Sequence, residues 1–252
     1  MYKEIKGGSS MITSIKNETI KNIIKLKQKK YRDENNLFLI EGFHLVEEAR
    51  KNRCIEKIVT TLDESFEEET IYVSKEVMNK LAFTKTPQPI MAICQKKLSQ
   101  DVSYEQSRYL LLDRLQDPGN IGTILRTALA FGYHHILISK DSVDLYNDKV
   151  IRATQGALFQ LQISIVDLKE EIIKLQKEGV HIYATALKNA KEISKFKGEE
   201  RMAFVMGNEG NGVSDEIIDL ADGTLYIPID SIESLNVAIA ASIVMYQFKD
   251  RK

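Results

Sequence analysis

Strand-like apolar runs alternate with helical patterns from Arg108 to the end of the chain. The first run, residues 109–112, is nearly all apolar, as expected for a parallel strand that is covered on both faces. This alternation predicts βαβ units around an open parallel α/β sheet. We expect helices at residues 121–131, 147–153, 168–177, 214–221 and 234–248, and further strands at 136–138, 161–166, 181–186, 203–206 and 224–229.

The amino-terminal part of the chain predicts a separate, smaller α/β domain over residues 12–97. We expect residues 1–11 to be a flexible leader, because they contain a Gly-Gly-Ser-Ser stretch. The polar residues 98–107 are interpreted as a linker, so the larger domain covers residues 108–252. Within the smaller domain we expect helices at 18–30, 43–51 and 75–83, and strands at 37–40, 55–61, 71–74 and 90–95.

The 252 residues carry a net charge of −1, so any surface for nucleic acid has to be local. A basic run near the amino terminus contains a single acid, Glu18. Such a run is either a solvated helix face or a surface that contacts phosphate groups. The residues that we expect to contact RNA are Lys16, Lys21, Lys25, Lys29, Lys30 and Arg32.

The sequence indicates neither a membrane segment nor a metal site. The longest apolar run, residues 237–246 with one serine, is far shorter than the roughly 18 residues that span a bilayer. The first 11 residues lack a hydrophobic signal core. Cys54 and Cys94 are isolated, which predicts reduced and buried thiols, and none of the histidines has metal-ligand spacing. We therefore expect a soluble, cytoplasmic protein without a metal.

Three segments place turn-forming residues directly after a strand-like run and before a helical pattern. They are residues 117–126, 205–210 and 227–237. In α/β domains, the loops at the carboxyl ends of the strands form the ligand site. We therefore expect these three segments to converge on one site.

Each segment also has a simpler structural interpretation. Asn120 could cap the helix that follows it, and Ser234 could do the same for the last helix. Arg126 lies six residues into an otherwise apolar helix, where it either snorkels or is placed for an anion. Residues 207–212 match neither a Walker loop nor a dinucleotide-binding motif, although Gly207 would allow a ligand to approach the backbone closely.

In this order and spacing, the three segments resemble the signature motifs of the SpoU, or TrmH-type, RNA ribose methyltransferases of the SPOUT superfamily. The resemblance covers nearly the whole chain after residue 11, since residues 40–46 and 152–159 resemble the branch that acts on ribosomal RNA. It implies a SPOUT α/β domain with a carboxyl-terminal trefoil knot, a rare exception to unknotted topology, and an accessory RNA-binding domain. One departure is Ser231, where the family commonly has glycine and where a side chain would narrow the loop.

The resemblance also implies roles for individual residues. S-adenosylmethionine is the implied cofactor, and a ribose 2′-oxygen is the implied methyl acceptor. We expect Arg126 to clamp a phosphate rather than act as a base, because a guanidinium pKa lies above about 12, and Glu209 or a water to accept the proton. The implied catalytic residues are Asn120, Arg126, Glu209, Ser234 and Asn236, and the implied cofactor-binding residues are Thr185, Leu187, Gly207, Ile227 and Leu235.

Three functions remain open from the sequence. The favoured one is 2′-O-methylation of ribosomal RNA, specifically 23S RNA. The alternatives are methylation of transfer RNA, which the large amino-terminal domain disfavours, and RNA binding without catalysis. The final helix, expected over residues 234–248, is apolar on nearly all sides, so it is either a buried core helix or a homodimer interface. We favour the interface.

Overall fold

The computed structural model describes residues 2–4, 10–98, 102–232 and 234–249. Tertiary contacts divide the chain into two units, each of which is built from two stretches of sequence. The first unit comprises Met1–Lys97 and Asp144–Phe159, and the second comprises Leu98–Val143 and Gln160–Lys252. The segment Asp144–Phe159 therefore packs with the first unit, although it lies inside the stretch 108–252 that the sequence assigned to the larger domain.

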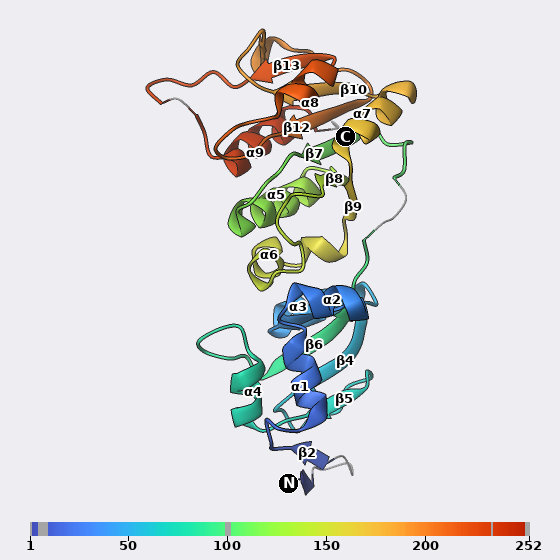
Figure 1. The fold of residues 1–252 in the computed structure, drawn as a ribbon, viewed down its shortest axis with the longest axis vertical. Helices are drawn as coiled ribbons and strands as arrows, with labels where there is room; N and C mark the ends of the chain where they lie inside the picture. The colour runs from blue at the N-terminus through green and yellow to red at the C-terminus, as the bar shows by residue number, and fades with distance from the viewer. Residues whose placement is uncertain (1, 5–9, 99–101, 233, 250–252) are drawn as a thin grey trace. The chain divides into compact units, whose positions relative to one another are not determined.

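The second unit contains a seven-stranded sheet with the order β11-β13-β10-β12-β7-β8-β9 (Figure 1). All neighbouring strands in this sheet run parallel, which confirms the predicted parallel α/β fold. The trefoil knot implied by the family resemblance stays a prediction. The strands are β7 (Arg108–Leu112), β8 (His135–Ser139), β9 (Gln162–Val166), β10 (His181–Thr185), β11 (Lys191–Glu192), β12 (Met202–Met206) and β13 (Gly223–Tyr226).

Helices cover both faces of this sheet. Successive strand residues point to opposite sides, so neighbouring residues of one strand contact different helices. Ala203 and Val205 of β12 belong to a core that α7 (Leu168–Lys177) and α8 (Asp215–Leu220) complete. Phe204, between them, faces the other way and stacks on Phe248 with ring centroids 4.9 Å apart. Two helices that contact each other, α5 (Pro118–Ala130) and α9 (Val237–Gln247), lie side by side in Figure 1.

The last helix, α9, is shorter than expected and is not buried all round. It begins at Val237 because the Asn236 side chain caps it, accepting hydrogen bonds from the backbone N–H groups of Ala238 and Ile239. One face packs into the unit. The opposite face leaves Ile239 51%, Ile243 37% and Tyr246 59% exposed.

The first unit contains a four-stranded mixed sheet with the order β3-β6-β4-β5. The helical run expected over residues 18–30 is two helices, because Leu26, Lys27 and Gln28 form tighter hydrogen bonds to the third residue before each. The strands are β3 (Leu37–Glu41), β4 (Ile55–Thr60), β5 (Thr70–Tyr72) and β6 (Ile90–Gln95), and the helices are α1 (Glu18–Lys25), α2 (Lys29–Asn35), α3 (Phe43–Lys51), α4 (Lys75–Leu81) and α6 (Asp148–Thr154).

The stretches expected to be a leader and a linker contain ordered contacts where they are described. Tyr2–Glu4 (β1) pairs antiparallel with Ser10–Ile12 (β2), whereas residues 1 and 5–9 lie outside the described residues. In the expected linker, residues 99–101 also lie outside them. Tyr104 packs against the core of the second unit, and its hydroxyl donates to Glu171 Oε1 over 2.5 Å. Burial and this carboxylate raise the pKa of Tyr104 to about 12.

The described residues contain neither a candidate membrane span nor a candidate metal site. None of the helices there is long and apolar enough to cross a bilayer. Within the same residues, no three His, Cys, Asp or Glu side chains are grouped so that they could hold a metal ion. Cys54 and Cys94 are both free and buried.

Candidate active site

A pocket of about 660 Å³ lies at the carboxyl ends of β10, β12 and β13. Its walls are the loops that follow these three strands and the first turns of α9. Most of the lining side chains are aliphatic, and we call this site the apolar pocket. The predicted residues that line it are Thr185, Leu187, Gly207, Glu209, Ile227, Ser234, Leu235 and Asn236.

The loop after β12, residues 207–214, folds back on itself directly behind Gly207. Asn208 and Gly212 exchange two backbone hydrogen bonds, of 3.0 and 2.9 Å. A Cβ atom on Gly207 would lie 2.0 Å from the backbone carbon of Gly212, so no other residue fits this position without moving the loop. The sequence predicted close approach of a ligand here; the structure adds close approach of the chain itself.

A chain of side-chain hydrogen bonds joins the three motif segments at the rim of the pocket. Asn236 Nδ2 donates to Asn120 Oδ1 over 2.9 Å, and Asn120 Nδ2 donates to Glu209 Oε1 over 3.1 Å. The backbone N–H of Asp117 donates to the same carboxylate oxygen over 3.3 Å. The predicted convergence of the three segments is therefore observed in the structure.

The capping interpretations of these motifs are wrong for two residues. Helix α5 is capped by Asp117, whose Oδ1 accepts from the backbone N–H of Asn120 over 2.7 Å. Helix α9 is capped by Asn236 rather than Ser234. The side chain of Asn120 is thus available to Glu209, while Ser234 lies exposed in the loop that lines the pocket. The role of Asp117 was missed, although an Asp before Pro at the start of a helix is a recognisable cap.

Arg126 is not brought into contact with this group. It lies on α5, six residues beyond Asn120, or about 9 Å along the helix axis. Its side chain is exposed and does not line the apolar pocket. Exposure of this side chain fits both interpretations made from the sequence, so its assignment to phosphate contact stays a prediction.

The loop before α9 contains a strained position at Ser231. This residue has a φ of 67°, in the left-handed region that glycine adopts most easily. The family's usual glycine would suit this conformation. Serine in place of glycine at residue 231 therefore strains the backbone, in addition to adding a side chain to the loop.

Of the six basic residues expected to contact RNA, all but Arg32 are exposed. Arg32 is 6% exposed and forms an ion pair with Asp144. Its Nη1 also donates to the carbonyls of Leu26 and Lys27, over 3.0 and 2.8 Å. The prediction that Arg32 contacts RNA is therefore wrong, since its guanidinium is used inside the unit. The lysines that remain exposed are Lys16, Lys21, Lys25, Lys29 and Lys30.

Two family models match the chain, and each covers one part of it. The SpoU rRNA Methylase family matches residues 107–246, and the MRM3-like substrate binding domain matches residues 17–92. The first of these alone spans more than half of the 252 residues.

Relatives of known name and structure resemble the chain over nearly its full length. The 23S rRNA (guanosine(2553)-2′-O)-methyltransferase RlmP of Bacillus subtilis is 37% identical, over 94% of this chain and 98% of that protein. An uncharacterized tRNA/rRNA methyltransferase of Synechocystis is 31% identical, over 94% of this chain and 92% of that protein. The crystal structure of an AdoMet-bound rRNA methyltransferase from Sinorhizobium meliloti superimposes with a TM-score of 0.86 at 30% identity, over 94% of this chain and 96% of that one. The chain belongs to the SpoU rRNA methylase family.

Proposed function

We propose that this protein transfers a methyl group from S-adenosylmethionine to a ribose 2′-oxygen in ribosomal RNA, with 23S RNA as the substrate. The hydrogen-bonded chain Asn236–Asn120–Glu209 at the rim of the apolar pocket carries the proposal. It places polar groups from three separate segments beside a site that can hold the cofactor. The printed name of the Bacillus subtilis relative supports the same reaction and the same RNA.

The apolar pocket fits the cofactor in size and in chemistry. Its volume lies within the roughly 300–1,000 Å³ of small-molecule sites. Leu187, Ile227 and Leu235 offer apolar surface for an adenine ring, and Gly207 presents backbone without a side chain. S-adenosylmethionine supplies an already activated methyl group when it is bound, so the protein has to position the acceptor and remove its proton.

Positioning is the larger task for the protein. Holding the 2′-oxygen in line for transfer is worth on the order of 7–11 kcal/mol in well-oriented systems. Asn236 fixes Asn120, and Asn120 in turn fixes Glu209, so the rim is ordered before the RNA arrives. Ser234, exposed in the same lining, is placed to contact the ribose.

Glu209 is the group that we assign to proton removal, directly or through a water. Its Oε1 accepts the hydrogen bonds from Asn120 and Asp117, so Oε2 is left to face the substrate hydroxyl. Arg126 is the clamp on the adjacent phosphate in this proposal, because a guanidinium offers several N–H donors and no acceptor.

We also propose that two copies of the chain associate through α9. Ile239, Ile243 and Tyr246 recur at helical spacing and stay exposed on its outer face. Burying them in a partner would account for a helix with so few polar residues. We place the enzyme in the cytoplasm, where ribosomal RNA is assembled, and retain the trefoil knot as part of this proposal.

The match to a substrate-binding domain at residues 17–92 favours ribosomal RNA over transfer RNA as the substrate. The exposed lysines of α1 and its flanks give this unit its phosphate-contacting surface. The pocket of cofactor size and the Asn236–Asn120–Glu209 chain beside it disfavour an RNA-binding protein without catalysis.

A methylation assay tests the proposal directly. Purified protein with S-adenosylmethionine should methylate a ribose 2′-oxygen in unmodified 23S RNA fragments and leave transfer RNA transcripts unmodified. Arg126→Lys should lower turnover about 100-fold while the cofactor still binds, because the bidentate clamp is lost. Methylation of transfer RNA alone would select the second function, and absence of cofactor binding in calorimetry would select the third.

The interface is tested separately by sedimentation. Ile243→Glu should convert a dimer into a monomer by placing a charge in the apolar contact. A native protein that sediments as a monomer would overturn this part of the proposal without affecting the reaction.

A further inference from the structure

A second cavity, of about 640 Å³, lies at the carboxyl ends of β7, β8 and β9. It shares Asn211, Val213 and Asp215 with the apolar pocket, so the loop 207–214 is part of the wall between the two sites. We call it the charged cavity, because its other lining residues are mostly ionic. They include Asp113, Arg114, Lys140, Asp141, Lys169 and Glu216.

The buried carboxylate of Asp113 lies behind the loop 207–214. Asp113 follows β7 directly, is 3% exposed, and its backbone N–H donates to the carbonyl of Met206 over 2.9 Å. Its Oδ2 accepts from the backbone N–H of Ser214 over 2.9 Å. The Asp113 side chain is therefore hydrogen-bonded to the last residue of the loop 207–214, and the Asp113 backbone is hydrogen-bonded to Met206, the residue before the loop.

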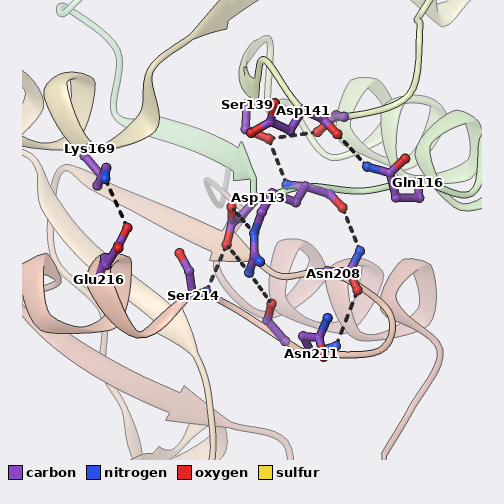
Figure 2. Close-up of polar contacts among 12 residues, drawn as sticks. Asp113, Gln116, Ser139, Asp141, Lys169, Asn208, Asn211, Ser214 and Glu216 are labelled. Carbon is purple, nitrogen blue, oxygen red and sulfur yellow. Dashed lines mark hydrogen bonds and ion pairs between the residues drawn. The ribbon is translucent and has the colours of Figure 1, made fainter.

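Arg114 completes the contact from the same turn. Its Nε and Nη2 donate to the two carboxylate oxygens of Asp113, over 3.1 and 3.2 Å, and Nη2 also reaches the Gly212 carbonyl at 3.4 Å. The carbonyl of Arg114 accepts from Asn208 Nδ2 over 2.7 Å. The Asp113 hydrogen bond raises the pKa of the Arg114 guanidinium. Figure 2 shows Asp113, Asn208 and Ser214 within this group of contacts.

The backbone at Arg114 is itself held in an unusual conformation. Its φ is 55°, in the left-handed region, and its N–H donates to Ser139 Oγ over 2.8 Å. A non-glycine residue stays in this conformation only where the surroundings enforce it. The Asp113–Arg114 turn is thus fixed by β8 on one side and fixes the loop 207–214 on the other.

We infer that Asp113 and Arg114 are positioning residues for the methyl transfer, although neither touches the apolar pocket. They hold the loop 207–214 at Asn208, Gly212 and Ser214, and this loop carries Glu209 to Asn120 and forms one wall of the cofactor site. Releasing the loop moves the wall and the carboxylate together. The inference rests on the proposed function, in that S-adenosylmethionine occupies the apolar pocket.

Calorimetry with S-adenosylmethionine tests this inference on the full chain. Asp113→Asn removes the charge that Arg114 neutralises, and Arg114→Gly removes the guanidinium while suiting the positive φ. Each should weaken cofactor binding about 10-fold at a temperature well below its melting point, with kcat lowered as well. Lys140→Ala, an exposed change on the same cavity, should leave cofactor binding unchanged.

The double variant separates positioning from general destabilisation. If the two residues act as one unit, the double variant should lose no more cofactor affinity than the more affected of the two single variants. Cofactor affinity within twofold of the native value in both folded single variants, or multiplicative losses in the double, would overturn the inference. If Asp113→Asn does not fold, Arg114→Gly alone decides the question. A native protein that fails to bind the cofactor would instead count against the proposed function.

Discussion

The apolar pocket and the charged cavity lie at the same edge of one sheet and have nearly the same volume, 660 and 640 Å³. They differ in what lines them. The apolar pocket has aliphatic walls with a few polar groups at its rim, as small-molecule sites generally do. The charged cavity is lined mostly by ionic side chains, some of which pair with one another, such as Lys169 with Glu216 at 3.0 Å. Volume therefore does not identify the site; the chemistry of the lining residues does.

The largest effect should come from glycine in the shared wall. Gly207→Ala would place a Cβ 2.0 Å from the Gly212 backbone and should weaken S-adenosylmethionine binding more than about 100-fold. Gly210→Ala is the matched control, because its Cβ would meet only Asn208 Oδ1, at 3.6 Å. Calorimetry on both variants gives the comparison. Equal affinities would mean that the wall is not rigid.

Two acids on opposite sides of the wall should differ next. Glu209→Ala removes the proposed proton acceptor and the partner of Asn120, so turnover should fall about 100-fold. Glu216→Ala breaks an exposed ion pair in the charged cavity and should leave turnover unchanged. Single-turnover methylation rates measure both. A comparable loss in Glu216→Ala would show that the charged cavity also takes part in the reaction.

A smaller effect should arise from the apolar surface itself. Leu187 is 77% exposed at the apolar pocket and would lose this exposure against the cofactor. Leu187→Ser should therefore weaken cofactor binding about fivefold, with kcat nearly constant. Lys140→Ser changes the charged cavity instead and should leave the dissociation constant as it is. Equal dissociation constants for the two variants would show that the cofactor does not bind against the apolar lining.

The smallest effect concerns the strained loop before α9. Ser231→Gly relieves a left-handed conformation that costs a non-glycine residue on the order of 1 kcal/mol. It should raise the free energy of unfolding by up to about 1 kcal/mol, measured by chemical denaturation, because the strain is already present in the free loop. Ser231→Ala keeps the strain and should unfold like the native protein. A gain in stability in Ser231→Ala would point to the hydroxyl rather than to the backbone.

Much of the fold could be predicted because it follows from short-range patterns. Helices α3 and α7 have the expected bounds, since caps and breakers mark their ends. Strand β13 ends at Tyr226, earlier than expected, because Pro228 has no N–H for a ladder. The parallel sheet and the family are confirmed.

The parts that could not be predicted depend on partners distant in sequence. Arg32 was assigned to RNA because its sequence neighbours are lysines, yet its partner Asp144 comes 112 residues later. The contact between Asn120 and Glu209 spans 89 residues in the same way. The family resemblance implied that these motif residues belong to one site. Hydrophobic periodicity could not predict this, because it reports only on residues close in sequence.

The ion pair between Arg32 and Asp144 also bears on how the protein is synthesised. The first unit takes its residues 144–159 from a stretch that leaves the ribosome after β7, α5 and β8 of the other unit. Until then Phe38 lacks Tyr146, whose ring lies 4.5 Å away, and the Arg32 guanidinium lacks its carboxylate. Withholding one partner of a buried pair costs about 3–5 kcal/mol. The first unit therefore cannot complete its fold during the first half of translation. Its core is complete only after residues 144–159 have been synthesised.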